Sequence, residues 1–129
     1  MAQVLIADDD EGIREALRML LEDEGYSVTE ASNGQETLDY LRRDSAGCVA
    51  LLDLVMPDVE GTELLEAIQS DAALTQRHVY VVLSAGAEAL MAQARPLVEA
   101  LGSVIVQKPF DIDEVTRVVG EAMQRLSAG

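Results

Sequence analysis

The stretch from Cys48 to Gly61 reads CVALLDLVMPDVEG and contains the strongest indication of the fold. Its first five residues are apolar or small without alternation, which is typical of a strand buried on both faces of a parallel sheet. Asp53 follows directly. Pro57 and Gly61 then indicate a loop, because proline cannot continue a central strand and glycine permits a turn. The sequence therefore predicts that Asp53 lies at the carboxyl end of a buried strand, where open α/β sheets bind their ligands.

Composition narrows the classes of function. The 129 residues carry 9 basic and 24 acidic side chains, for a net charge of −15. This charge argues against direct binding to nucleic acid or an anionic membrane, and it favours a cation or a partner with a basic patch. No apolar run approaches the ~20 residues of a membrane span, and the first residues lack a signal-peptide pattern. Cys48 is the single cysteine, so we expect a small buried side chain and a cytoplasmic location.

The length suits one domain with a sizeable core. We expect a single domain over residues 1–129, with residues 3–126 as its core and 127–129 as a tail or the start of a linker. Further apolar runs predict strands at 4–7, 26–31, 79–83 and 104–106. Because helical patterns alternate with these runs, the predicted fold is a doubly wound α/β domain with a parallel five-stranded sheet and five helices.

The helix boundaries are predicted from capping residues. The apolar stripe from Ile13 to Leu21 follows the acidic run at 8–11, in which Asp10 is expected to cap the helix, and it precedes Gly25 at the helix end. The later helices are expected to begin near Asn33 with Glu36, at Thr62, and near Asp111 with Glu114. The helical pattern over 87–101 contains Pro96, which predicts a kink or a break, with Pro96 starting a second short helix. His78, the single histidine, is expected to be structural or exposed.

Polar side chains follow four of the predicted strands. Since the carboxyl ends of parallel strands share one edge of the sheet, these side chains are expected to meet there: Asp8 and Asp9, Asp53, Ser84 and Lys108. The strand at 26–31 carries no ionisable group beyond Glu30, which predicts that it lies at an edge of the sheet, away from this site.

The motifs at these strand ends resemble those of two-component response-regulator receiver domains, over about residues 3–126. They are the acidic pair Asp8-Asp9, DLVMPDVEG beginning at Asp53, VLSA around Ser84 and KPF at Lys108. Each motif is weak alone, but all four in this order and spacing are specific. The resemblance implies a flavodoxin-like (βα)5 fold with strand order 2-1-3-4-5, an order of which this family is a known example.

The resemblance also implies a chemistry. Asp53 would accept a phosphoryl group from the phosphohistidine of a sensor histidine kinase or a phosphotransfer protein. Asp9, Asp53 and the carbonyl of Val55 would bind Mg²⁺, with Asp8 acting through water. Such oxygen ligands suit this cation, and a divalent cation offsets the repulsion between a carboxylate and a phosphoryl group.

Ser84 would donate a hydrogen bond to a phosphoryl oxygen, and Lys108 would add a mobile positive charge. The bond from Lys108 to Pro109 would be cis, as in the family. Such a domain catalyses its own phosphorylation and slow dephosphorylation, yet it is a signalling switch rather than a turnover enzyme. Val55 and Gly86 are expected to affect how water reaches the acyl phosphate.

Two features depart from the family pattern. The position three residues before Lys108 usually carries an aromatic side chain that moves on activation, and here it is Ile105. The second departure is Pro96, together with a slightly long spacing from Ser84 to Lys108. The switch would act on the face formed by the helix at 87–101, the strand at 104–106 and the last helix. That face is expected to bind an output protein or domain, or a second copy in a homodimer.

Three alternatives stay open at this point. A phosphorylation-independent interaction module would keep the fold, and Ile105 is the one feature that favours it. A Mg²⁺-dependent phosphohydrolase would need a second acid two residues after Asp53, where the chain has Val55. A flavin-binding protein would need a phosphate loop after the first strand, where Asp8 and its neighbours would repel a phosphate.

Because clustered acids repel one another, Asp8→Ala or Asp53→Ala is predicted to raise metal-free stability.

Overall fold

The computed structural model describes residues 3–56, 58–59, 61–84 and 88–128, with the side chains of 88–91 left out. Pro57 and Gly86 therefore lie outside the described residues. Within the described chain, five strands form one sheet. The strands are β1 (Gln3–Ala7), β2 (Ser27–Ala31), β3 (Val49–Asp53), β4 (Val79–Ser84) and β5 (Val104–Gln107). All four pairings are parallel, in the order β2-β1-β3-β4-β5, which confirms the predicted fold and the edge position of β2.

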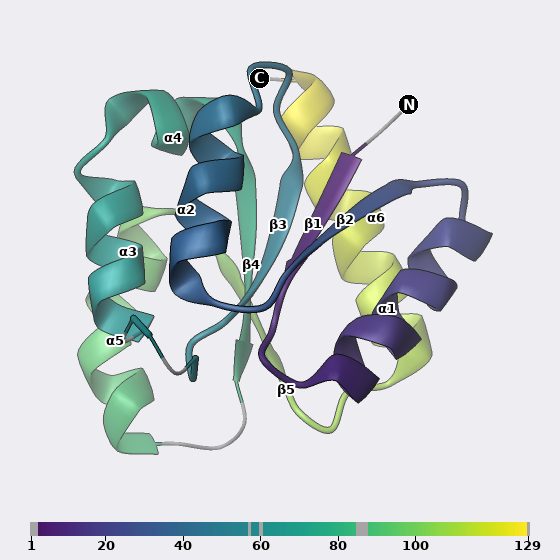
Figure 1. Cartoon of the computed structure of the whole chain (residues 1–129), viewed down its shortest axis with the longest axis horizontal. Coiled ribbons are helices and arrows are strands. Elements are labelled where there is room, and N and C mark those ends of the chain that lie inside the picture. The colour runs from purple at the N-terminus through teal and green to yellow at the C-terminus, as the bar shows by residue number, and fades with distance from the viewer. Residues whose placement is uncertain (1–2, 57, 60, 85–87, 129) are drawn as a thin grey trace.

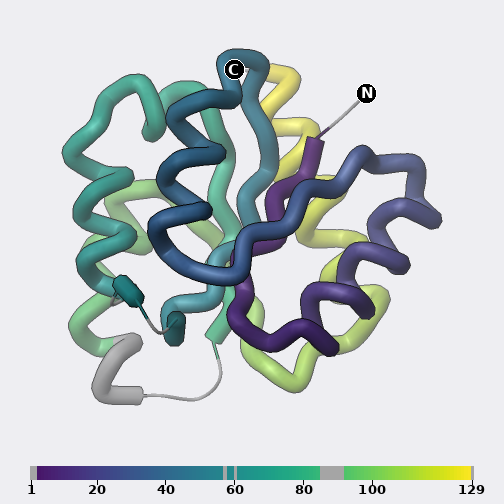
Figure 2. The backbone as a smooth tube through the Cα atoms, in the orientation of Figure 1, coloured from purple at the N-terminus to yellow at the C-terminus, as the bar shows by residue number. Residues whose placement is uncertain are grey.

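Helices cover both faces of the sheet (Figure 1). They are α1 (Glu11–Asp23), α2 (Gly34–Arg43), α3 (Gly61–Gln69), α4 (Ala72–Arg77), α5 (Glu88–Ala100) and α6 (Ile112–Ala128). The tube in Figure 2 shows α1 and α6 on one side, with α2, α3 and α5 on the other. The helices that the sequence predicts at 87–101 and after Asp111 are thus α5 and α6. Nothing in the sequence analysis predicted α4.

Alternation along the central strands produces two separate cores. Leu5, Ala50 and Val82 point toward α2, α3 and α5. Val4 and Leu51 are among the residues that point the other way, toward α1 and α6. The central strands are buried on both faces, as their continuous apolar runs predict. No described helix combines the length and the apolar character needed to cross a membrane.

Several helix ends differ from the predictions. Asp10 caps α1 as expected, because its side chain accepts a hydrogen bond from the amide of Ile13. The prediction for Thr62 was wrong, since α3 begins at Gly61 and includes Thr62. Pro96 lies within one helix, so the predicted second helix does not exist.

The capping box at Asn33 is half formed. Asn33 accepts a hydrogen bond from the amide of Glu36 at 2.8 Å. The Glu36 carboxylate, however, binds the amide and hydroxyl of Ser32, each at 2.9 Å, rather than the amide of Asn33. At the start of α6, Asp111 accepts from the amide of Asp113 at 2.8 Å. The last helix also runs to Ala128, two residues beyond the predicted core.

Candidate functional site

Four strand ends bring the predicted site residues to one rim of the sheet. Ala7 pairs with Leu52, which places Asp8 beside Asp53 at the ends of β1 and β3. Asp53 pairs with Leu83, and Ser84 pairs with Gln107, so Ser84 and Lys108 follow on the neighbouring strands. The amide of Lys108 also donates a hydrogen bond to the carbonyl of Ser84 at 2.6 Å. The parallel register therefore gathers residues from distant parts of the chain.

Lys108 lies between two carboxylates of this rim. Its Nζ is 2.6 Å from Oδ2 of Asp8 and 3.4 Å from Oδ2 of Asp53. The Asp8 side chain is fully buried and that of Lys108 is 13% exposed, so water screens this pair poorly. Burial by itself lowers the pKa of Lys108, but the hydrogen bond to Asp8 and the charge of Asp53 outweigh it and raise that pKa. Lys108 therefore stays positively charged at the rim. Its peptide bond to Pro109 is cis, as the resemblance implies.

The Asp53 carboxylate is in an unusual electrostatic environment. Asp53 is only 3% exposed, and this burial raises the pKa of its carboxyl group to about 6. The Val55 amide, which donates to Oδ1 at 3.0 Å, opposes this shift. The charge of Asp8 raises the same pKa and the charge of Lys108 lowers it. Asp53 is thus a buried acid whose ionised form needs neighbouring positive charge, a condition found at functional sites.

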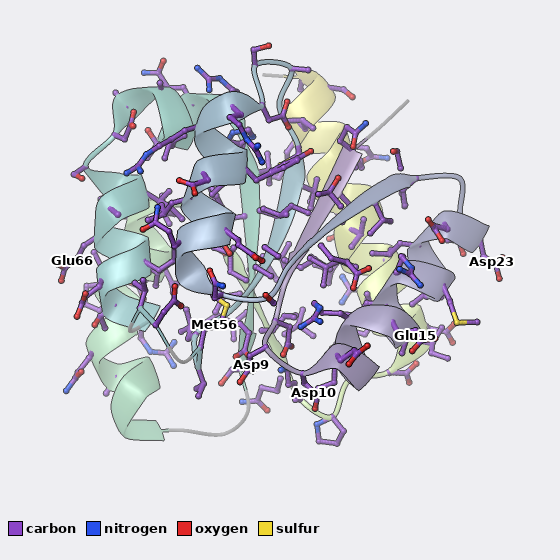
Figure 3. The ribbon with its side chains drawn as sticks, in the orientation of Figure 1. Asp9, Asp10, Glu15, Asp23, Met56 and Glu66 are labelled. Carbon is purple, nitrogen blue, oxygen red and sulfur yellow. The ribbon has the colours of Figure 1, made fainter. Side chains whose placement is uncertain are left out.

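Three carboxylates at the rim can hold a metal ion. Asp8, Asp9 and Asp53 each offer an oxygen, and these oxygens lie within 4.8 Å of one another. Asp9 is exposed while the other two are buried, so the group opens toward solvent at Asp9. In Figure 3, Asp9 and Met56 lie at the same end of the sheet, where the strands finish. Hard oxygen donors in this arrangement fit Mg²⁺, which keeps several waters and takes few carboxylates.

The segment after Asp53 alternates between core and solvent. Leu54 and Met56 are 3% and 8% exposed, whereas Val55 is 51% exposed. Gly61 begins α3 against this segment, because a Cβ on it would lie 2.5 Å from the carbonyl oxygen of Leu54. The backbone around Val55 is therefore held close to the start of α3.

Arg14 is a residue of the site region that the sequence analysis missed. Its Nη1 donates to the carbonyl of Asp8 at 2.7 Å, and its Nε contacts Glu30 of β2 at 3.3 Å. Arg18 also contacts Glu30, at 2.7 Å. The pair Arg14 and Glu30 thus ties the backbone of Asp8 to β2 and α1. The spacing of four residues between Arg14 and Arg18 indicates that both lie on one face of a helix, but it does not indicate which residues they contact.

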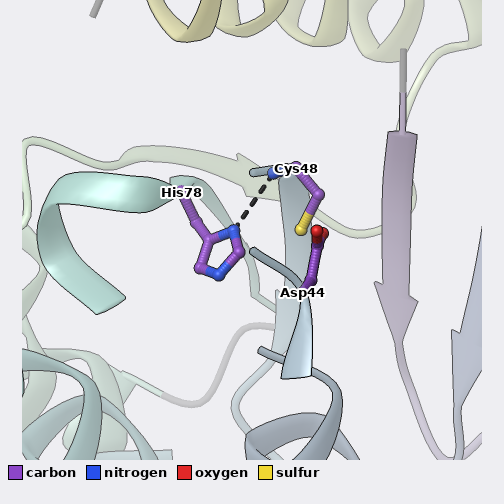
Figure 4. Close-up of side chains that lie close together, drawn as sticks. All are labelled: Asp44, Cys48 and His78. Carbon is purple, nitrogen blue, oxygen red and sulfur yellow. Dashed lines mark hydrogen bonds between the residues drawn. The ribbon is translucent and has the colours of Figure 1, made fainter. Parts of the chain in front are cut away.

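A second cluster lies at the start of β3 and β4 and consists of Asp44, Cys48 and His78 (Figure 4). The amide of Cys48 donates to Nδ1 of His78 at 3.0 Å. The imidazole therefore carries its proton on Nε2, which donates to the carbonyl of Leu41 at 2.9 Å. Both ring nitrogens are engaged by the backbone, and burial lowers the pKa of His78. This arrangement confirms a structural histidine and a buried Cys48.

Comparisons with known proteins show the family and the fold of the chain. Residues 4–120 match the sequence model of the family described as the response regulator receiver domain. The chain is 30% identical over 126 residues to the response regulator Rre1 of Synechocystis, covering 97% of this chain and 53% of that protein. It is 29% identical over 123 residues to the transcriptional regulatory protein SrrA of Staphylococcus aureus, covering 95% and 48%. The chain thus spans about half the length of these relatives.

Solved structures include a similar fold. A CheY-like response regulator receiver domain from Methanospirillum hungatei matches with a TM-score of 0.84 and 30% identity. The match covers 99% of this chain and 98% of that one. The fold and the family model thus agree over nearly the same residues.

Proposed function

Because the chain belongs to the response regulator receiver domain family of two-component systems, we propose that it is a phosphorylation switch whose acceptor is Asp53. The donor would be a phosphohistidine on a sensor histidine kinase or a phosphotransfer protein. One observation above all supports this proposal: Lys108 lies against both Asp8 and Asp53 at the rim where the three carboxylates gather. This arrangement combines a nucleophile, metal ligands and a cation for the phosphoryl oxygens.

In the proposed reaction, a carboxylate oxygen of Asp53 forms a bond to phosphorus while the bond from phosphorus to the donor imidazole nitrogen breaks. The leaving imidazole takes up a proton. A bound Mg²⁺ would supply positive charge that lowers the repulsion between the two anions. Asp9, Asp53 and the carbonyl of Val55 would be its ligands. Asp8, whose oxygens contact Lys108 and the amide of Asp10, would act on the metal through water.

The charged and polar neighbours would then hold the product. Lys108 would exchange its contact with Asp53 for one with a phosphoryl oxygen, since that anion carries more charge than the carboxylate it replaces. The Ser84 hydroxyl, at the end of the neighbouring strand β4, would donate to another oxygen. Hydrolysis of the acyl phosphate would return the domain to its first state, so the chain acts as a switch with slow self-catalysed turnover.

The output face would be formed by α5, β5 and α6. Ile105 is half-buried and packs against the core beneath α5, in place of the aromatic side chain usual in the family. A shallow hollow on this face is lined by Arg95, Ile105, Gln107, Pro109, Asp111 and Glu114. Binding of an output protein or domain, or of a second copy, to this face would shift with phosphorylation. The net charge of −15 fits a protein partner better than direct contact with nucleic acid, and we propose a cytoplasmic location.

The proposal is tested by incubation with Mg²⁺ and acetyl phosphate, followed by intact mass measurement. The wild-type protein should gain about 80 Da, the mass of one phosphoryl group. Asp53→Asn should show no gain, because an amide is not a nucleophile of this kind. Asp71→Asn is the matched control, since Asp71 caps α4, outside the acidic rim, and it should gain mass like the wild type. A gain that persists in Asp53→Asn, or no gain in the wild type, would overturn the assignment.

A further inference from the structure

Asp58 contacts a helix that is distant from it in the chain. Its Oδ1 accepts a hydrogen bond from the amide of Gly34 at 2.7 Å, and its Oδ2 accepts one from the amide of Gln35 at 3.0 Å. Together with Asn33, which accepts from the amide of Glu36, these bonds satisfy the first three amides of α2. Such amides have no partner inside their own helix. Asp58 therefore joins the segment after Asp53 to the start of α2.

The backbones also approach closely at this junction. A Cβ on Gly34 would lie 2.6 Å from Cβ of Val59 and 2.9 Å from its Cγ2. Real side chains do not tolerate such distances, and the Cβ of Val59 is not a flexible end that can turn away. Val59 is partly buried and packs against the core formed with α2 and α3. The lack of a side chain at Gly34 is thus what allows Asp58 and Val59 to dock on α2.

The same segment is held at its other end. Leu54 is buried and lies against Gly61 at the start of α3, as described above. Val55 lies between these two attachments, with its amide bonded to Oδ1 of Asp53 and its side chain exposed. Because Asp58 follows Val55 by only three residues, the position of Asp58 limits where the Val55 peptide can lie.

We propose that Asp58 is a positioning residue for the metal site: by docking on the start of α2, it holds the Val55 carbonyl where it can bind Mg²⁺. This inference rests on the proposed function, which assigns that carbonyl to the metal. Asp58 itself takes no part in the chemistry, because both of its oxygens are engaged by amides of α2. Residues that orient metal ligands in this way commonly affect metal affinity although they do not touch the ion.

The test measures Mg²⁺ affinity by calorimetric titration at constant ionic strength, without a phosphodonor. Asp58→Ala should weaken Mg²⁺ binding by about 10-fold, at the lower end of the effect of such supporting residues. The matched control is Asp71→Ala, which removes a carboxylate that accepts from two amides at the start of α4, at 3.1 Å and 3.4 Å. This control loses a comparable cap and the same charge, and should bind Mg²⁺ like the wild type.

Two further variants separate position from charge. Gly34→Ala removes no charge and favours the helix, yet its Cβ displaces Val59 and should weaken Mg²⁺ binding. Asp58→Asn loses the charge but keeps one oxygen for the amide of Gly34, so its affinity should lie between those of the wild type and Asp58→Ala. Both variants keep the test decisive if Asp58→Ala does not fold.

The possible outcomes are distinct. If the wild type does not bind Mg²⁺, the proposed function fails and the positioning role fails with it. If the wild type binds but Asp58→Ala and Gly34→Ala bind equally well, the positioning role alone is refuted. If Asp58→Asn is as weak as Asp58→Ala while Gly34→Ala matches the wild type, the effect comes from charge and the positioning role is again refuted.

Discussion

Lys108 and Asp8 are 100 residues apart in the chain, yet Nζ of the lysine lies 2.6 Å from Oδ2 of the aspartate. The contact crosses from the end of β5 to the end of β1, past the ends of β3 and β4. It gives the fully buried Asp8 carboxylate a cation, without which its burial would be costly. The same Nζ lies farther from Asp53, at 3.4 Å from its Oδ2. The two acids therefore respond differently to substitution.

Asp53→Asn should raise the metal-free free energy of unfolding by on the order of 1–3 kcal/mol near pH 7.5, because the pKa of Asp53 is raised to about 6 and its ionised form is disfavoured in the fold. Chemical denaturation in the presence of EDTA checks this. Glu15→Gln, an exposed acid on α1, is the control and should change little. The clustered acids alone predict a gain for Asp8→Ala as well, but this substitution also removes the closest partner of Lys108, so its gain should be smaller than that of Asp53→Asn. Equal gains in both variants would contradict this difference.

Mg²⁺ should stabilise the wild-type protein. At ten times its dissociation constant, a ligand that binds only the folded state adds roughly 1.4 kcal/mol. Thermal melts with increasing MgCl₂, at constant ionic strength, measure the gain. Asp9→Asn removes the exposed ligand of the acidic group and should reduce the gain. The metal site is refuted if the melting temperature of the wild type does not depend on Mg²⁺.

Acidification should destabilise the protein through His78. Burial lowers the pKa of this imidazole in the folded state, so the unfolded chain binds its proton first as the pH falls below 6.5. The stability contributed by the neutral ring is present above pH 6.5 and is lost between that pH and the lower folded pKa. Urea unfolding at pH 7.5 and 5.5 measures the net change, which also includes the opposite contribution of Asp53, whose pKa of about 6 means that it takes up a proton over the same range.

His78→Gln is the comparison for that measurement, because the carboxylates also titrate in acid. It should be less stable than the wild type at pH 7.5, since it loses the bridge from Cys48 to Leu41. Between pH 7.5 and 5.5 its free energy of unfolding should fall less than that of the wild type, or rise more. Identical pH profiles would show that His78 does not contribute to the acid sensitivity.

Two glycines should respond to alanine in opposite directions. Gly61→Ala places a Cβ 2.5 Å from the carbonyl oxygen of Leu54, so we expect a loss of about 1–3 kcal/mol, as for other overpacked sites. Gly120→Ala lies within α6, where a Cβ meets no atom within 4 Å. It should stabilise the protein by about 0.5–1 kcal/mol through helix propensity. Denaturant unfolding of both variants checks the pair, and a gain for Gly61→Ala would contradict the tight junction with Leu54.

The strands and the rim were predictable from the sequence, because both follow from short-range patterns. Continuous apolar runs mark strands buried on two faces, and parallel strands must share a carboxyl edge. Asp8, Asp53, Ser84 and Lys108 each follow such a run directly, so their meeting required no knowledge of distant contacts. The arrangement within the rim was not predictable, since the choice of Lys108 between two acids depends on side-chain geometry.

The errors concern features that depend on tertiary contacts. α4 has six residues and one buried side chain, Leu74, which is too little for a helical pattern to show. Pro96 does not divide α5 because it lies on the exposed side of the helix, whereas Ala94 and Val98 pack in the core. Water can therefore bind the backbone carbonyl four residues earlier, which has no proline N–H to accept from. Asp58 binds amides 23 and 24 residues away, and no local signal names such partners.

The alternation of β1 between the two cores also governs the geometry of the acids. Sliding β1 by one residue against β3 would turn Leu5 and Ile6 to the wrong sides of the sheet, and it would carry Asp8 about 3.3 Å along the strand. That displacement exceeds the 2.6 Å separation between Asp8 and Lys108. A chain that packs its apolar residues correctly has therefore already aligned its carboxylates, and a misaligned rim could form only in a protein that had also lost both cores.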